Sequence, residues 1–180
     1  MQASVTSLSP TLEDAVNDHV LAAQQGDSSA FEHLYRRHAP GLMPMLWRLS
    51  GGDRTLAEDW LQDSFVLAWK KLAQLREPHA FAGWLRKLAI NCALSEKRRG
   101  RLESISEYTE ASAPEPPWPA ADLDLERAIT DLPKRAREVL VLFQLEGWTH
   151  EEIAKYLKVE PGTNKSQLNR ARTLLKEKLK

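Results

Sequence analysis

Residues 149–175 read THEEIAKYLKVEPGTNKSQLNRARTLL, a pattern typical of two helices joined by a tight turn. Thr149 and Glu152 have the spacing of a capping box, which predicts a short helix over about 151–157. Lys158, Val159 and Glu160 form the predicted turn, and a proline follows at 161. Because proline suits the first position of a helix, a second helix is expected over 161–178. The stretch therefore predicts a helix-turn-helix.

The second of these helices has two contrasting faces. Its inward face is predicted to carry Asn164, Leu168, Ala171 and Leu175, which are spaced by three or four residues. Asparagine, arginine and serine can hydrogen-bond to base edges in the major groove, and lysine and arginine neutralise phosphates. The exposed side and its flanks are expected to present Lys165, Ser166, Gln167, Asn169, Arg170, Arg172 and Thr173. This composition favours duplex DNA binding, and the alternative is a helical hairpin with a solvated basic face.

The rest of the chain also has helical periodicity, and no run alternates with period two for long enough to form a sheet. Ser29 and Glu32 have capping-box spacing, and Pro40, Gly41 and Pro44 are expected to break or kink the helix that follows them. The predicted helices cover about 13–25, 29–47, 54–72, 80–99, 123–130, 134–145, 151–157 and 161–178. The fold class is therefore predicted to be all-α.

An acidic stretch with four prolines divides the chain. Residues 100–122 contain few large apolar side chains apart from Trp118, so they are interpreted as a flexible linker. The predicted organisation is a helical domain over 1–99, the linker over 100–122 and a helix-turn-helix domain over 123–180. The C-terminal domain is small enough to be near the lower limit for independent folding.

The 180 residues carry no formal net charge, because 25 Lys and Arg balance 25 Asp and Glu. The charges are nevertheless segregated along the chain. Residues 61–100 hold eight basic and three acidic side chains, residues 101–130 hold two and seven, and residues 131–180 hold eleven and seven. Electrostatic attraction is local at physiological salt, so two basic regions can still bind a polyanion.

Several classes of protein are disfavoured. No apolar run approaches the length of a membrane span, and the N-terminus lacks the pattern of a signal peptide. Cys92 is the single cysteine, which fits a reducing, cytoplasmic setting. His150 and Glu151 begin like a zinc-protease motif, but Ala154 stands where the second histidine is required. With no glycine-rich phosphate loop either, the sequence predicts no enzyme activity, no metal and no cofactor.

The chain from about residue 18 onward resembles the bacterial extracytoplasmic-function sigma factors of the sigma-70 family. The C-terminal resemblance rests on Leu132-Pro133, Arg137-Glu138-Val139, Glu146-Gly147, Glu151-Glu152-Ile153-Ala154, Gly162-Thr163, Lys165-Ser166, Leu168 and Arg170-Ala171-Arg172. The N-terminal resemblance rests on Gly26-Asp27, Ala30-Phe31, Leu34-Tyr35-Arg36-Arg37, Ala57-Glu58-Asp59, Gln62-Asp63, Phe65, Ala68-Trp69, Phe81, Trp84-Leu85, Ala89 and Asn91.

The resemblance implies three binding surfaces. Core RNA polymerase, through the clamp of its largest subunit, is expected to bind the acidic edge of the 54–72 helix, at Asp59, Gln62, Asp63 and Val66. Melted promoter DNA of the minus-ten element is expected to bind Arg76, His79, Lys87, Asn91, Ser95 and Arg98. Duplex DNA of the minus-thirty-five element is expected to bind Lys165, Ser166, Asn169, Arg170, Arg172 and Thr173.

The same resemblance implies an anti-sigma factor as a further partner and association with the nucleoid when the protein is bound to polymerase. Trp60, Ser95, Asn164 and Gln167 depart from the family pattern. Two alternatives remain open at this point. One is a sigma-like decoy that occupies an anti-sigma protein, and the other is a dimeric helix-turn-helix repressor, which leaves the acidic helix unexplained.

Overall fold

The computed structural model describes residues 12–95, 116 and 122–179, and all secondary structure in these ranges is helical. The N-terminal helices are α1 (Leu12–Gln24), α2 (Ser28–Ser50), α3 (Arg54–Lys71), the short turns η1 (Leu72–Gln74) and η2 (Pro78–Ala80), and α4 (Phe81–Leu94). The C-terminal helices are α6 (Leu123–Thr130), α7 (Lys134–Leu140), η3 (Val141–Leu145), α8 (His150–Leu157) and α9 (Pro161–Lys178). The all-α prediction is confirmed for these residues, whereas the predicted linker and Trp118 lie almost wholly outside them.

The N-terminus of α2 differs from the prediction. Asp27, and not Ser29, is the capping residue, because its carboxylate accepts hydrogen bonds from the backbone N–H groups of Ser29 and Ala30 at 2.8 and 3.2 Å. Aspartate is among the best N-caps, and these bonds lower the pKa of Asp27, led by the bond from the Ser29 hydroxyl. Gly26 precedes the cap with a φ of +96°, a conformation that glycine adopts without strain and that reverses the chain after α1.

The prolines were expected to break or kink α2, and the structure shows no break. The helix continues for 23 residues with Pro40 and Pro44 in its interior. A proline removes one backbone hydrogen bond and crowds the preceding turn, so an isolated helix would be interrupted here. Leu42, Met45 and Leu46 are almost fully buried on either side of the prolines, and we attribute the continuity of the helix to this packing.

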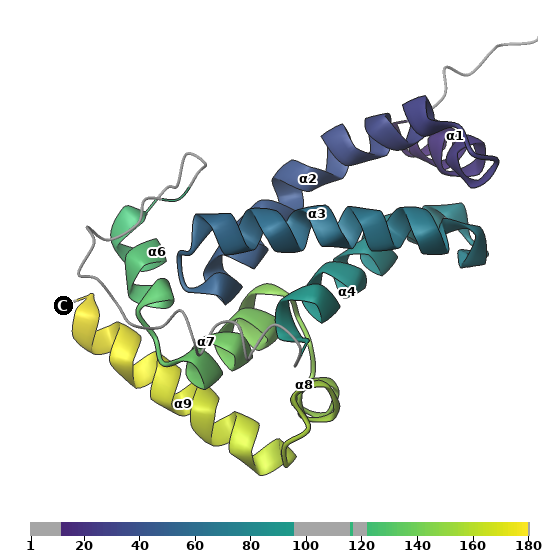
Figure 1. Cartoon of the computed structure of the whole chain (residues 1–180). Helices are drawn as coiled ribbons and strands as arrows, with labels where there is room; N and C mark the ends of the chain where they lie inside the picture. The colour runs from purple at the N-terminus through teal and green to yellow at the C-terminus, as the bar shows by residue number, and fades with distance from the viewer. Residues whose placement is uncertain (1–11, 96–115, 117–121, 180) are drawn as a thin grey trace, which may run out of the picture.

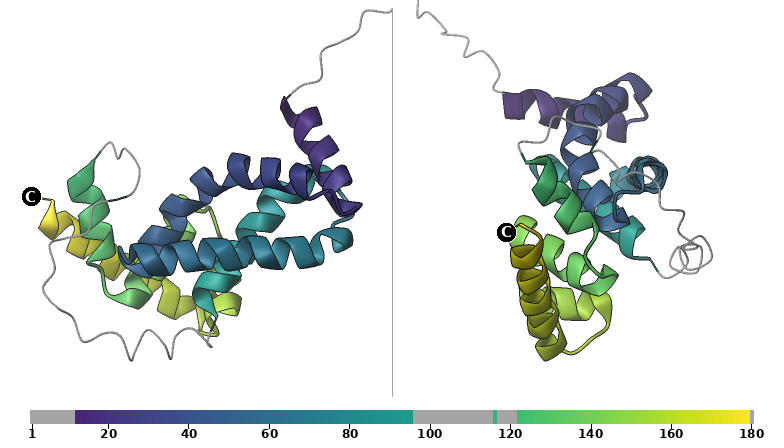
Figure 2. Two further views of the ribbon diagram at one scale, coloured as in Figure 1. Left: turned by 45° about the horizontal axis from the view of Figure 1, so that its top comes forward. Right: turned by 90° about the vertical axis from the view of Figure 1, so that its left-hand side faces the viewer.

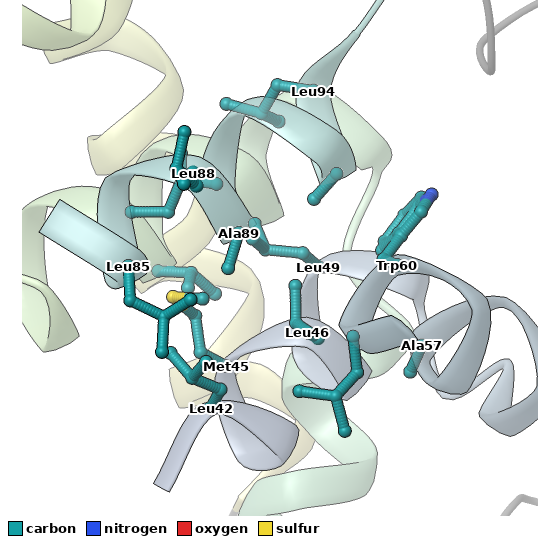
Figure 3. Close-up of a cluster of buried hydrophobic side chains, with 14 of the residues drawn as sticks. Leu42, Met45, Leu46, Leu49, Ala57, Trp60, Leu85, Leu88, Ala89 and Leu94 are labelled. Atoms are coloured by element: carbon teal, nitrogen blue, oxygen red, sulfur yellow. The ribbon is translucent and has the colours of Figure 1, made fainter. Parts of the chain in front are cut away.

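The core of the N-terminal helices lies between α2, α3 and α4. Figure 3 shows Leu42 and Met45 of α2 beside Leu85 of α4, with Trp60 of α3 at the other side of the cluster. Trp60 is 1% exposed. This departure from the family pattern therefore fills the core and adds no contact area for a partner. Burying one such large side chain contributes about 2–3 kcal/mol.

The C-terminal helices form a second packing unit, in which α7 contacts α9, and α8 contacts both α9 and η3. The predicted helix over 134–145 is present, but its last five residues form a π-helical turn. Glu146 and then Gly147, with a φ of +72°, lead from this turn toward α8. Val139, Ile153 and Leu168, from α7, α8 and α9, are buried together in the core of this unit.

The two sets of helices also pack against each other. Helix α2 contacts α6, α7 and η3, and the buried apolar side chains of both sets form one continuous cluster. Helices α6–α9 lie along one side of α2–α4, and α1 lies at the end of the molecule away from α6 (Figure 1 and Figure 2). Within the described part of the chain, no helix has the length and apolar character needed to span a membrane.

Candidate nucleic-acid and polymerase interfaces

The first helix of the predicted helix-turn-helix begins with a complete capping box. The Thr149 hydroxyl accepts from the Glu152 backbone N–H at 3.2 Å, and the Glu152 carboxylate accepts from the Thr149 N–H at 2.8 Å. The bonds that Thr149 donates are the main cause of the lowered pKa of Glu152, with a smaller contribution from the positive charge of Lys87. This arrangement is the one that the sequence predicted.

The turn and the second helix follow as expected. Lys158 ends α8 with a φ of +53°, which turns the chain toward Pro161 at the start of α9. Asn164 lies on the buried face of α9, and its side-chain N–H donates to the carbonyl of His150 at 3.1 Å. Asn164, which departs from the family pattern, therefore supplies a side-chain amide that links α9 to α8.

The exposed face of α9 carries all six residues predicted for duplex DNA. Two of them have partners within the molecule: the Arg172 guanidinium donates to Gln144 at 2.9 Å, and the Ser166 hydroxyl donates to the Thr163 carbonyl at 2.8 Å. The residues that the structure places on this exposed face are Lys165, Ser166, Asn169, Arg170, Arg172 and Thr173. Gln167 lies half-buried at its border. The face offers the donors and acceptors that reading a major groove requires.

The predicted polymerase-binding edge lies along α3. Gln62 and Val66 are exposed, with 46% of Val66 accessible, while Asp59 and Asp63 are half-buried. The opposite side of α3 is buried in the core through Trp60, Leu61, Phe65 and Ala68. The four predicted residues therefore do share one edge, and that edge combines two carboxylates with an apolar side chain.

The predicted single-stranded DNA residues are distributed over α4 and the connection that precedes it. Arg76 and His79 are exposed between η1 and α4, and Lys87 and Asn91 are exposed on α4. Ser95 is half-buried at the end of α4, where its hydroxyl donates to the Cys92 carbonyl at 3.3 Å. Arg98 lies outside the described residues.

Sequence reasoning missed the contacts that this surface makes with the C-terminal helices. The Tyr156 hydroxyl of α8 donates a hydrogen bond to the Asn91 side chain, and partial burial raises the pKa of Tyr156. Five residues before Asn91 on α4, Arg86 forms a bidentate ion pair with Glu146. A cavity of about 480 Å³ between the two sets of helices is lined by Lys87, Trp148, Glu152, Lys155 and Tyr156. No local sequence signal connects residues so far apart in the chain.

The described part of the chain holds no cluster of three or more His, Cys, Asp or Glu side chains placed to bind a metal ion. Cys92 is a half-buried free thiol on α4, and burial raises its pKa. A thiol held in its protonated form is a poor nucleophile and a poor metal ligand.

Two family profiles match the chain. The profile for sigma-70 region 2 matches residues 34–103, and the profile for sigma-70 region 4 matches residues 122–175. The first match contains α3 and α4 with the predicted polymerase and single-stranded DNA residues. The second contains the helix-turn-helix of α8 and α9.

Relatives and solved structures agree with these profiles. The chain is 33% identical over 167 residues to the ECF RNA polymerase sigma factor SigE of Mycolicibacterium smegmatis, covering 86% of the chain and 64% of that relative's length. It is 32% identical over 168 residues to SigM of Mycobacterium tuberculosis, covering 88% of the chain and 82% of SigM. The sigma factor RpoE, solved in complex with the anti-sigma factor NepR from Bartonella quintana, has a TM-score of 0.58 at 28% identity, covering 83% of the chain and 96% of RpoE.

The chain therefore belongs to the sigma-70 family, in its group of extracytoplasmic-function RNA polymerase sigma factors.

Proposed function

We propose that the protein binds core RNA polymerase and directs it to a particular set of promoters as an alternative sigma factor. The observation that carries this proposal is the exposed polar and basic face of α9 in a capped helix-turn-helix, within a chain that also has the α3 edge and the α4 surface. A dimeric repressor would have no use for the α3 edge. A decoy for an anti-sigma protein would not need DNA-reading side chains.

The minus-thirty-five contact is assigned to α9 in duplex DNA. Asn169 and Arg170 project from the centre of the exposed face, where they can reach base edges, and Lys165 lies one turn closer to the helix start. Arg172 and Thr173 lie further along the same face and are assigned to contacts with the phosphates of the DNA backbone. A bidentate arginine–guanine contact discriminates by about 1–3 kcal/mol against the wrong base.

The minus-ten contact is assigned to α4 and to the connection before it. Lys87 and Arg76 supply positive charge for the backbone of a melted strand, and Asn91 can hydrogen-bond to an unstacked base. His79, Ser95 and Arg98 complete the proposed set. Single-stranded binding of this kind depends strongly on salt, because phosphate neutralisation releases counterions.

The polymerase contact is assigned to Asp59, Gln62, Asp63 and Val66, facing the clamp of the largest subunit. In this proposal the polymerase carries out catalysis, and the chain has no enzyme site of its own. The protein acts in the cytoplasm, and it associates with the nucleoid when it is bound to polymerase. An anti-sigma factor is a further proposed partner, since a similar solved sigma factor was captured with one.

Run-off transcription of fragmented host genomic DNA by core polymerase tests this function. Adding the protein is expected to produce discrete transcripts that share a pair of upstream elements. Arg170→Ala is expected to weaken promoter use by about 1–3 kcal/mol and to relax the preference at one base of the upstream element. Lys176→Ala, which removes a basic side chain from the same helix outside the proposed set, is the matched control. Failure to bind core polymerase would overturn the proposal and favour the decoy.

A further inference from the structure

Helix α1 packs against the connection between α3 and α4. It contacts η1 and η2, the two short turns of that connection, and Val20 and Ala23 of α1 are buried in the core. Figure 1 shows α1 at the end of the molecule where this connection lies. Helix α1 precedes the residues that the sigma-70 region 2 profile matches, so the family match does not explain this packing.

The last residue of α1 is hydrogen-bonded to the connection. The half-buried side-chain amide of Gln24 donates to the backbone carbonyls of Leu72 and Leu75, with N–O distances of 2.9 and 2.7 Å. A glutamine amide carries two N–H groups, so both donors are used on the same turn. Carbonyl groups at the end of a helix need partners from outside it, and Gln24 supplies one here.

The bond to Leu75 sets the direction in which the chain continues to Arg76. Because a peptide unit is planar, the Leu75 carbonyl and the Arg76 nitrogen lie in one plane, and a bond to the oxygen holds that plane. Leu75 has extended backbone, with φ of −75° and ψ of 109°, so the helical path ends at this residue. Arg76 itself is exposed. Its orientation therefore depends on the backbone that Gln24 holds and not on packing of its own side chain.

The position of Gln24 is fixed in turn by the chain reversal that ends α1. The Gly26 N–H donates to the Ala23 carbonyl at 3.0 Å, and the Asp27 N–H donates to the Ala22 carbonyl at 3.2 Å. Gly26 permits this reversal because its φ is +96°. The amide of Gln24 therefore extends from a helix end that is tied to the core through the buried Ala23.

We propose that Gln24 is a positioning residue for the minus-ten contact, which holds the turn over 72–75 so that the Arg76 guanidinium is presented to the melted strand. The inference rests on the proposed function of Arg76. A loosely held connection would lose conformational freedom when Arg76 binds DNA, and that entropy loss weakens binding. A turn that Gln24 already holds is ordered before DNA arrives, so binding loses less free energy.

Hydrogen exchange of the full-length protein, followed by mass spectrometry, tests the anchoring without polymerase or DNA. Gln24→Met keeps the length of the side chain and removes both N–H donors. The peptide over 73–80 is expected to exchange about fivefold faster, the value of one hydrogen bond, whereas α4 is expected to exchange as in wild type. Gln25→Met is the matched control, because Gln25 is the neighbouring exposed glutamine, and it is expected to change neither segment.

Unchanged exchange over 73–80 in Gln24→Met would overturn the anchoring. Equal acceleration over 73–80 and over 81–94 would also overturn it, because Gln24 would then stabilise the N-terminal helices as a whole and not this connection.

Binding of the polymerase complex to a promoter fragment with a single-stranded minus-ten element tests the effect on DNA. The fragment comes from a promoter that the wild-type protein uses in run-off transcription. Gln24→Met is expected to weaken binding by about fivefold and to reduce the slope of log affinity against log salt by up to about 0.7, because one phosphate contact is weakened. A general loss of stability would leave that slope unchanged.

Arg76→Ala completes the test as a double-mutant cycle. Because Gln24 acts through Arg76, adding Gln24→Met to Arg76→Ala is expected to weaken binding no further. Additive losses, or a loss with an unchanged salt slope, would overturn the role assigned to Gln24. A wild-type protein that yields no transcripts would contradict the proposed function itself. An active wild type with equally tight binding by Gln24→Met would contradict only the positioning.

Discussion

The side-chain amide of Asn164 donates a hydrogen bond to the backbone carbonyl of His150, 3.1 Å away, and thereby joins the buried face of α9 to the first turn of α8. Asn164 is only 1% exposed, and the His150 ring stacks on Phe143 with 4.4 Å between the ring centroids. One polar contact inside an otherwise apolar junction thus helps to set the orientation of the helix proposed to read DNA.

Asn164→Ala is expected to lower the free energy of unfolding by about 1–3 kcal/mol, because the partly buried hydrogen bond to the His150 carbonyl is lost. Urea denaturation followed by circular dichroism measures this change. Asn169→Ala removes an exposed asparagine from the same helix, and its cost is expected to stay within about 0.5 kcal/mol. Equal costs for the two variants would contradict the role assigned to Asn164.

Thr149→Ala is expected to cost about 1 kcal/mol, because it removes the hydroxyl that caps α8. Thermal unfolding measures the loss, with Thr163→Ala in the exposed first turn of α9 as the control. The pKa of Glu152 is lowered below its ordinary 4.5 in the folded state. The Thr149 backbone N–H donates to this carboxylate, and the contribution is therefore present above that value and is lost as the pH falls through the folded pKa, so the difference between Glu152→Gln and wild type should shrink in acid.

His38 gives a second prediction of how stability depends on pH, and here the titrating group is a base and not an acid. Burial, with a smaller effect from Arg37, lowers the pKa of His38 below its ordinary 6.5, and its ring lies 5.2 Å from that of Phe81. Below about pH 6.5 the unfolded chain takes up a proton that the folded chain resists, so the free energy of unfolding should fall as the pH is lowered.

The His38→Phe variant is expected to lose this part of the pH dependence, as measured by urea denaturation at several pH values. Proton NMR of the imidazole of His38 gives the direct check. A titration midpoint at or above 6.5 would rule out the proposed cause.

Val66→Asp is expected to weaken binding to core polymerase by about tenfold or more while leaving the fold intact, because Val66 is the exposed apolar residue of the proposed α3 edge. Leu179→Asp is the matched control, since Leu179 has nearly the same exposed fraction but lies at the end of α9. Equal binding by both variants would move the polymerase contact away from this edge.

Elements defined by local signals were predicted closely from the sequence. Helices α6 and α9 have the predicted bounds, 123–130 and 161–178, because an N-cap and a proline act within a few residues. Asp122 caps α6 by accepting from the Leu125 N–H at 2.9 Å, and the Thr149 capping box opens α8. The faces of α3 and α9 also follow from periodicity, since side chains three or four residues apart share one side of a helix.

Local rules were insufficient where two signals compete. Ser29 and Asp27 both suit a helix N-cap, and the choice of Asp27 was decided by a backbone reversal that begins at Gly26. Pro40 and Pro44 predicted a break or a kink in α2, and the helix is not broken, because apolar packing on both sides of the prolines outweighs the missing backbone bonds. Propensity is a weak guide in such places because tertiary burial is worth more than one hydrogen bond.

The sequence by itself determined the all-α class, the helix-turn-helix and the side chains that each helix exposes, because these depend on periodicity and capping over a few neighbouring residues. Only the tertiary structure decided that Asn91 faces Tyr156, that Arg86 pairs with Glu146 and that Arg48 pairs with Glu126. These partners are 65, 60 and 78 residues apart in the chain. Such pairings arise when two apolar surfaces meet and bring their polar rims into register, which no local pattern encodes.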